Sequence, residues 1–474
     1  MSSPAAPKVG AAPFILEPTR PGTSMKYLGG PPFHRYLIAY FVGSISIFIL
    51  WSAVGILLPN QIQLVEFDHY FAGTGVTPEI LTQLASNSYT GPDAAHLTEI
   101  YNQYNAARAS SLSVVNAVGS LFTLFSQPLV GVFSDRWRSR WGRRSFWIFT
   151  GALIGALLLI GLRYAPSVLF ITVFWVTAQV SINFSQGPLT TTIADRTPED
   201  RLGTVSAIAG VGTMAGALMG SFVAGYAFNA FGLDTYYFFA VFLVFGTTFF
   251  VLMAKDRSSR DLELPSFSWK EFLLGFTIAL RDHDYRWVWV ARLLMFLGYT
   301  ASTTFNLYVL QSYIRPTLTQ AQANATLPLL SLVSLPGMII AMLVSGKASD
   351  MIGRRKPFVI FSSFGIVLAY TLPIFWPTLP ALFAMSIITG FAFGVYMTVD
   401  QALFIDVLPD PESAGRDLGL SGAASNIGQM LAPVIAGQIV ALIVGSQGYR
   451  MVYVFAAVAV LLAALAIYPV KKVK

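Results

Sequence analysis

The chain has 474 residues and a net charge of +7 at pH 7, with 55% hydrophobic and only 11% charged residues. Soluble domains carry about 25% charged residues. This composition, with a mean hydropathy of +0.62, therefore excludes an ordinary soluble domain and indicates many membrane spans. Because the chain has no Cys, it can form neither a disulfide nor a thiolate metal site.

Twelve apolar segments are each long enough to cross a bilayer, which takes about 20 residues in a helix. A charged stretch at 255–286 separates the first six from the last six. We therefore predict an all-α membrane protein with two pseudo-symmetric six-helix bundles, at 37–254 and 287–469, joined by a cytoplasmic loop at 255–286. The predicted spans are 37–58, 110–133, 146–164, 167–193, 203–228, 236–254, 287–312, 326–345, 357–376, 380–405, 418–444 and 449–469.

The segments outside the bundles are predicted from their composition. Residues 1–36 are rich in Pro and Gly and lack the apolar core of a signal peptide, so we expect a cytoplasmic tail. We expect residues 470–474 to form a second, shorter cytoplasmic tail. The largest loop, 60–109, is expected outside the cell and contains two short helical patterns, one of them capped by Thr77 with Pro78 in its first turn.

The placement of Lys and Arg sets the orientation. With the N-terminus inside, 25 of the 30 Lys and Arg residues lie on the inner side. Such an excess predicts a multi-pass protein of the cell membrane with both termini in the cytoplasm. It also explains the net positive charge, which therefore gives no reason to expect a nucleic-acid partner.

One charged loop occurs twice, as GVFSDRWRSRWGRR at 131–144 and as GKASDMIGRR at 346–355. A repeat of this kind is typical of transporters whose two halves enclose a site near the middle of the membrane. We expect its charges to form ion pairs that hold the inner side closed in one state and break in the other. The alternative is that the arginines only set topology. The candidate gating residues are Gly131, Asp135, Arg136, Gly142, Arg143, Arg144, Asp195, Asp350, Gly353, Arg354, Arg355 and Asp406.

Polar residues within spans are costly and usually face a cavity or another helix. In the fourth span, Gln179, Asn183, Gln186 and Thr190 share one helical face. Uncharged amides and hydroxyls suit a sugar, and aromatic rings can stack on its C–H faces; hydrogen bonding between helices is the alternative. Similar polar faces occur in the second span (Asn116, Ser120, Thr123, Gln127) and the seventh (Arg292, Tyr299, Thr303, Asn306). The candidate substrate-binding residues are Trp51, Asn116, Gln179, Asn183, Gln186, Thr190, Tyr299, Asn306 and Tyr396.

Two charges lie inside spans. Asp400 lies six residues before Asp406, and Arg292 lies six residues after Arg286. Both are therefore about 9 Å inside the inner boundary, where they can pair. We expect Asp400 to carry a coupling proton with Arg292 as its partner. The alternative is a permanent structural pair in a passive facilitator.

The doubled loop resembles the signature of the major facilitator superfamily. Its longer first copy and the run NFSQGPLTTTIAD at 183–195 resemble the branch that contains sucrose:proton symporters, animal sugar-transporter relatives and bacterial homologues. The resemblance implies that spans one, four, seven and ten line the cavity. Two positions depart from the plant symporters, because Gln179 replaces an Asp implicated in proton coupling and Thr190 replaces an Arg implicated in sugar transport.

The remaining predictions concern function class. No Gly-rich ATP-binding loop is present, which favours a secondary transporter for a sugar over an ATP-driven one. We predict no enzyme activity, no cofactor and no metal site, and we expect a monomer. The alternatives are a facilitator or exporter of another small organic solute or drug, and a membrane sensor without turnover. Gly212, Gly216 and Gly220 form a ridge of small residues expected to pack against another helix.

Overall fold

The computed structural model describes residues 15–16, 24–262, 280–408, 414–443 and 445–473. Two short strands, β1 (Ile15–Leu16) and β2 (Lys26–Tyr27), pair in antiparallel fashion. The first half contains α1 (Gly30–Phe71), α2 (Pro78–Ser86), α3 (Ala94–Arg136), α4 (Ser145–Arg163), α5 (Val168–Arg196), α6 (Leu202–Phe231) and α7 (Thr235–Met253). The second half contains α9 (His283–Thr304), α10 (Asn306–Ser312), α11 (Gln320–Ile352), α12 (Lys356–Phe375), α13 (Leu379–Asp406), α14 (Ala414–Leu442) and α15 (Gln447–Ala466).

The number of spans agrees with the sequence prediction. In the described part of the chain, ten helical segments are long and apolar enough to cross a membrane, or eleven with the bent pair α9–α10. One of the ten segments, Glu199–Met253, holds both α6 and α7. These two helices separate at Gly232, whose φ of +56° lies in the left-handed region that glycine tolerates. Counting α6 and α7 as two separate spans adds one to these eleven and gives twelve spans.

Two helices are much longer than predicted, because α1 has 42 residues and α3 has 43. The segment 60–109 is therefore mostly helical rather than a loop. The predicted helix at Pro78 is confirmed as α2, and the Thr77 side chain accepts a hydrogen bond from the backbone N–H of Ile80 at 3.4 Å. The second helical pattern in this segment is confirmed as the first turns of α3.

The seventh span is broken, where the sequence predicted one continuous helix at 287–312. The helix α9 ends at Thr304, α10 begins at Asn306, and their axes differ by 44°. Phe305 between them has a φ of −108° and a ψ of 19°, outside helical values. The Tyr308 hydroxyl donates to the Pro59 carbonyl oxygen at 3.0 Å, which ties α10 to α1 of the other half.

The segment that precedes the first helix is shorter than the predicted N-terminal tail. The helix α1 begins at Gly30, seven residues before the predicted start of the first span, and Pro residues occupy its first turn, where their missing N–H costs nothing. Before it, the Tyr27 hydroxyl donates to the Lys255 carbonyl oxygen at 2.6 Å, and the Ser24 hydroxyl donates to the Asp256 carboxylate at 3.0 Å. Residues 24–29 therefore lie against the first half.

The expected glycine ridge is confirmed. A Cβ atom added to Gly216 would lie 3.0 Å from the Ile45 carbonyl oxygen, and one added to Gly220 would lie 2.2 Å from that of Ile49. Glycine at these positions therefore lets α6 approach the backbone of α1 closely.

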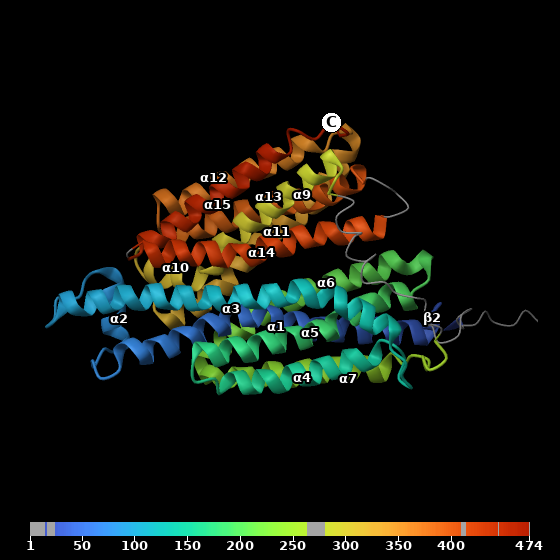
Figure 1. Ribbon diagram of the computed structural model, residues 1–474, viewed down its shortest axis with the longest axis horizontal. Coiled ribbons are helices and arrows are strands. Elements are labelled where there is room, and N and C mark those ends of the chain that lie inside the picture. Colours follow the sequence, from blue (N-terminus) through green and yellow to red (C-terminus); the bar gives the residue numbers. More distant parts are fainter. Residues whose placement is uncertain (1–14, 17–23, 263–279, 409–413, 444, 474) are drawn as a thin grey trace, which may run out of the picture.

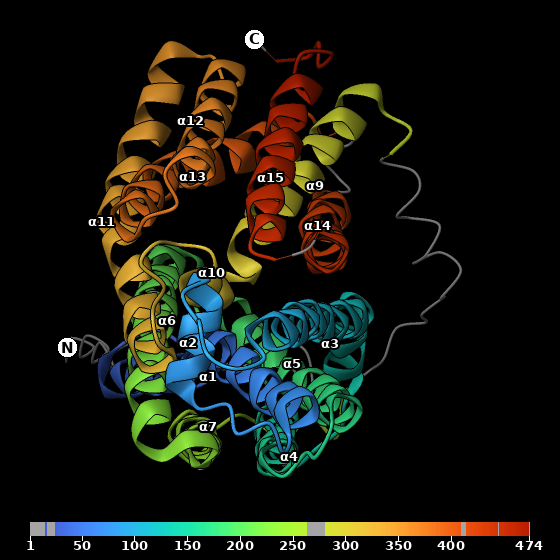
Figure 2. The same cartoon turned by 90° about the vertical axis from the view of Figure 1, so that its left-hand side faces the viewer.

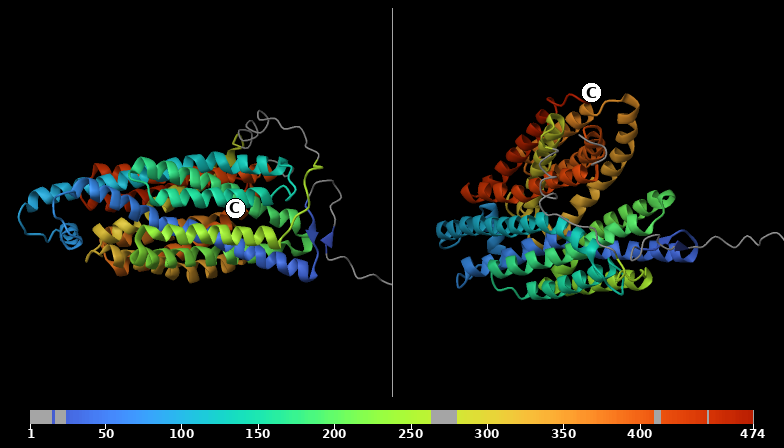
Figure 3. Two further views of the ribbon diagram at one scale, coloured as in Figure 1. Left: turned by 90° about the horizontal axis from the view of Figure 1, so that it is seen from below. Right: turned by 45° about the vertical axis from the view of Figure 1, so that its right-hand side comes forward.

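The two halves lie one above the other (Figure 1), and they meet through α3 against α14 and α6 against α11 (Figure 2). They are close together at the end that carries α2 and α10, and they diverge toward the end that carries the C-terminus (Figure 3). We call these the α2 end and the Arg-rich end, since the repeated loops lie at the latter.

Candidate functional site

A cavity of ≈ 240 Å³ lies where the first half meets α14. Eight of its ten lining residues carry an amide or hydroxyl, the other two are aromatic, and none carries a charge. We call it the amide cavity. Its lining residues are Phe48 and Trp51 of α1, Ser120, Thr123 and Gln127 of α3, Gln179, Asn183 and Gln186 of α5, and Asn426 and Gln429 of α14.

Hydrogen bonds orient most of these side chains. The Trp51 indole N–H donates to Gln186 Oε1 at 2.6 Å, and the Asn426 amide donates to Gln127 Oε1 at 3.1 Å across the two halves. Gln179 Oε1 is buried and accepts no hydrogen bond from the described residues. It lies close to α3, because a Cβ atom on Gly119 would be only 2.4 Å from it. Within the described part of the chain this buried acceptor is therefore unsatisfied, although the Gln179 side chain lines the cavity.

A second cavity of ≈ 270 Å³ lies toward the second half, and its lining also carries no charged residue. We call it the hydroxyl cavity, after its many Ser, Thr and Tyr side chains. Helix α1 contributes to both cavities, with Trp51 in the amide cavity and Ser52 in the hydroxyl cavity. Ser52 and Ser221 share a hydrogen bond of 2.5 Å at its wall.

The predicted substrate-binding residues divide into three groups. Trp51, Gln179, Asn183 and Gln186 meet in the amide cavity. Tyr299 and Asn306 line the hydroxyl cavity, and the Tyr299 ring stacks on Phe393 with centroids 4.0 Å apart. Three lie outside both linings: exposed Thr190, half-buried Asn116 and fully buried Tyr396.

In the amide cavity, sequence reasoning missed Phe48 of α1 and two lining residues of α14, Asn426 and Gln429. Asn426 and Gln429 stand three positions apart in α14 and so face one side of that helix, which is a signal that the spacing of the sequence contains. The contribution of the second span was also underestimated, since Ser120, Thr123 and Gln127 all line the amide cavity.

The two membrane charges form a buried pair. Arg292 Nη2 lies 2.6 Å from Asp400 Oδ2, and the Asp400 side chain is 0% exposed. Arg292 also donates to Ser421 of α14 at 2.9 Å and to Gln401 at 3.1 Å, and its guanidinium lies over the Phe404 ring at 4.3 Å. Neither charged residue is among those that line the two cavities. The pair thus joins α9 to α13, and Arg292 also connects both to α14.

The repeated loop forms one ion-pair cluster in each half. In the first, Arg144 lies 2.5 Å from Asp135 and 2.8 Å from Asp195, and Arg143 lies 2.8 Å from Asp195. Arg144 also donates to the Ser134 hydroxyl at 2.6 Å. This first cluster ties the end of α3 to the end of α5.

The second cluster repeats this geometry, with fewer contacts among the described residues. Arg355 lies 2.5 Å from Asp350 and 3.3 Å from Asp406, and it donates to the Ser349 hydroxyl at 2.9 Å. Arg354 is exposed, and no ion pair to it occurs among the described residues. All these pairs join helix ends within one half rather than between halves, in a state in which the Arg-rich ends diverge.

The loop glycines allow tight turns. Gly142 and Gly353 have φ values of +87° and +66°, in the left-handed region that disfavours other residues. A Cβ atom on Gly142 would also lie 2.7 Å from the Asp256 side chain. Gly131, by contrast, has no neighbouring atom within 4 Å of such a Cβ, and Arg136 is half-buried at the end of α3.

Two helical bundles around uncharged central cavities define a membrane carrier. The chain matches the model of the Major Facilitator Superfamily over residues 36–319 and 288–474, and it belongs to that superfamily. It is a multi-pass membrane transporter rather than an enzyme. The branch is not resolved by the comparisons, so the resemblance to sucrose:proton symporters stays a prediction.

Several solved transporters share the fold. The nucleoside transporter NupG (D323A mutant) has a TM-score of 0.68 at 14% identity, over 91% of this chain and 98% of its own. A bacterial homolog of the human lysosomal transporter Spinster, inward-facing and unoccupied, has a TM-score of 0.64 at 14% identity, over 93% and 97%. The human organic anion transporter MFSD10 (TETRAN) has a TM-score of 0.56 at 15% identity, over 93% and 100%. No curated protein matches the chain.

Proposed function

We propose that the protein moves a sugar, a mono- or disaccharide, through the amide cavity by alternating access, as a proton symporter of the cell membrane. The composition of this cavity carries the proposal, because eight of its ten lining residues are uncharged and polar. A sugar offers many hydroxyl groups to such amides, and its apolar faces fit the rings of Phe48 and Trp51.

The same composition argues against other substrate classes. A carrier of apolar drugs needs a cavity dominated by apolar walls, and a carrier of ionic solutes needs a counter-charge. The linings of the amide and hydroxyl cavities include no Asp, Glu, Lys or Arg. Nucleosides are the second candidate, because they are also neutral and polyhydroxylated, and a nucleoside transporter shares this fold.

Asp400 is proposed as the proton carrier. Its Oδ1 atom accepts no hydrogen bond from the described residues, which leaves one carboxylate oxygen open to a proton. Protonation would weaken the pair with Arg292, whose guanidinium also holds Ser421 of α14. Because α14 supplies Asn426 to the amide cavity, loss of this contact would reach the substrate site.

The two loop clusters are proposed as the gating elements at the cytoplasmic, Arg-rich end. The first cluster fixes the end of α5, which also carries Gln179, Asn183 and Gln186. A change in its ion pairs during transport would therefore alter the position of a cavity helix relative to α3.

Uptake into proteoliposomes tests the substrate. Radiolabelled mono- and disaccharides, with uridine and adenosine as the second class, are offered with and without an inward proton gradient. We expect gradient-driven sugar uptake that Q186L lowers about tenfold or more, since it removes the bond with Trp51 and a cavity amide. Q83L, the same change on exposed Gln83 of α2, serves as the control and should transport normally. Absence of uptake of every sugar would overturn the substrate assignment.

A separate variant tests the coupling. D400N should abolish accumulation against a gradient and flatten the pH dependence, while counterflow of the same sugar continues. D284N removes another buried carboxylate, at the start of α9, and should keep both properties. Normal accumulation and pH dependence in D400N would instead establish the pair with Arg292 as structural.

A further inference from the structure

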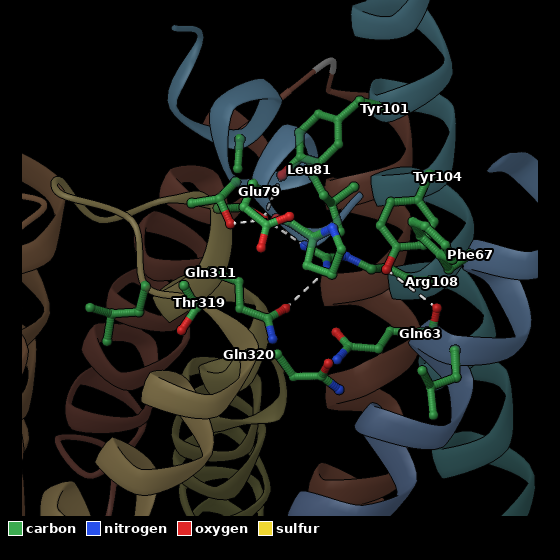
Figure 4. Close-up of a pocket in the computed structure, with 16 residues that line it drawn as sticks. Gln63, Phe67, Glu79, Leu81, Tyr101, Tyr104, Arg108, Gln311, Thr319 and Gln320 are labelled. Atoms are coloured by element: carbon green, nitrogen blue, oxygen red, sulfur yellow. Dashed lines mark hydrogen bonds between the residues drawn. The ribbon is translucent and has the colours of Figure 1, made fainter. Parts of the chain in front are cut away.

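A third pocket, of ≈ 240 Å³, lies at the α2 end, far along the bundles from the Arg-rich loops. Its walls come from α1, α2 and α3 of the first half and from α10 and α11 of the second (Figure 4). We call it the outer pocket, and the residues that matter here are Phe67, Glu79, Leu81, Tyr101, Arg108 and Gln311.

The first-half wall of the outer pocket is a packed unit. The ends of α1 and α3 form a small apolar core with α2, separate from the main core, in which Phe71, Leu84 and Tyr104 are buried. The αL residue Asn87 ends α2 and donates its backbone N–H to the Leu84 carbonyl oxygen at 3.2 Å. Helix α2 is therefore fixed in place and can serve as one side of a binding site.

Arg108 is the central side chain of this pocket and is only 2% exposed. It donates to Gln311 Oε1 at 3.1 Å and to the Ser312 hydroxyl at 2.6 Å, both in the other half. Its guanidinium lies over the Tyr308 and Tyr104 rings at 4.4 and 5.1 Å.

The charge of Arg108 is left without a carboxylate partner within 4.0 Å among the described residues. The Glu66 carboxylate accepts from the Ser111 hydroxyl at 2.6 Å instead. In addition, Arg108 Nε and the amide nitrogen of Gln311 are buried and donate to no described residue. A buried guanidinium without a counter-charge and two idle donors are costly, which points to a missing acceptor.

We propose that the outer pocket binds a small organic monocarboxylate. A carboxylate supplies acceptors of the kind that these donors lack, and its charge neutralises the guanidinium. Phe67, Leu81 and Tyr101 supply apolar and aromatic surface for the body of the ligand. Glu79, in the lining of the same pocket, disfavours a multiply charged anion such as phosphate.

A ligand bound in this pocket affects transport because it contacts both halves of the protein. Because its walls come from both halves, the pocket exists only while the α2 ends touch. A ligand that binds one conformation stabilises that conformation. The bound carboxylate therefore holds the α2 end closed, acts from outside the cell, and inhibits the transport cycle without entering the amide cavity.

Binding is tested on the purified full-length protein with benzoate, its neutral analogue benzyl alcohol, and inorganic phosphate as probes. We expect benzoate to raise the melting temperature saturably, and the other two to have no effect. Equal stabilisation by benzyl alcohol would show that the negative charge of the ligand is irrelevant to binding. Equal stabilisation by phosphate would show that the apolar walls of the pocket are irrelevant to binding. Either result overturns the proposal, as does no effect of benzoate.

Variants locate the site. R108Q should weaken benzoate binding about tenfold or more, and S312A should weaken it less, by loosening Arg108 without removing its charge. Arg163 is the control, because it is 29% exposed and is paired with Asp234 at 2.6 Å. R163Q should bind benzoate as the wild type does. If R108Q does not fold, S312A and R163Q still test the location of the site, because equal benzoate affinity in these two variants would refute a site at Arg108.

Spin labels test the conformational effect. The chain has no Cys, so D200C and M351C place the only two labels on exposed positions at the Arg-rich ends of the two halves. Benzoate should increase the population with the longer distance between labels. A shift to the shorter distance, or no shift at saturating benzoate, contradicts the stabilisation of the closed α2 end.

Discussion

Replacing Asp195 by Asn should destabilise the protein far more than replacing Asp406 by Asn, although the two residues occupy equivalent positions in the repeat. The reason is burial. Asp195 is 13% exposed and its partner Arg144 is 3% exposed, whereas Asp406 is 40% exposed and Arg355 is 20% exposed. Among the described residues, Asp195 also accepts from two arginines and Asp406 from one.

The magnitude follows from these contacts. Breaking a buried ion pair by removing one partner costs about 3–5 kcal/mol, because the other charge stays buried. Asp135 still pairs with Arg144 in D195N, so we expect the lower end, about 3 kcal/mol. An exposed pair contributes about 0–1 kcal/mol, which is the range expected for D406N.

Thermal unfolding in detergent, at one scan rate for all variants, measures the difference. A common scan rate matters because large membrane proteins often unfold irreversibly. D195N should melt well below D406N, and D406N close to the wild type. High salt should lower the stability of the wild type little, since a buried pair is weakly screened. Equal melting temperatures for D195N and D406N would refute the link between burial and stability.

Two further predictions concern packing and pH. G220A should destabilise by about 1–3 kcal/mol, because its Cβ would meet the α1 backbone, whereas G210A on the same helix meets no atom within 4 Å and should not. Burial alone would raise the pKa of Asp284, but hydrogen bonds from His283 and the backbone amides of Lys471 and Lys472 outweigh it and lower the pKa below its ordinary 3.8. A lowered pKa in the folded state means that the stabilisation is present above this value and disappears as the pH falls through the lower folded pKa. The melting-temperature difference between wild type and D284N should thus stay undiminished from pH 8 to pH 5 and vanish only below about pH 4.

The lining of the amide cavity was partly predictable. The spacing of Gln179, Asn183 and Gln186 predicted one shared face, and all three line the amide cavity. Asn116 follows the same rule in the second span but lies outside both linings. Periodicity shows which residues share a helical face, but the rotation of the helix decides what that face meets.

The pairing of Arg292 with Asp400 is a second case. Equal depth along two helices made the contact plausible, and the structure brings their side chains to 2.6 Å. The contact with Ser421 was not predictable, because it depends on how α14 packs against α9.

Composition and local spacing were enough to predict a membrane transporter of twelve spans in two halves. The length of each apolar segment and the repeated loop can both be read directly from the sequence. Helix packing alone determined the break at Phe305, the unequal burial of the two loop clusters, and the outer pocket around Arg108. The outer pocket, for example, arises where residues about 200 positions apart come into contact, as Arg108 does with Ser312, and no local pattern in the sequence records such a contact.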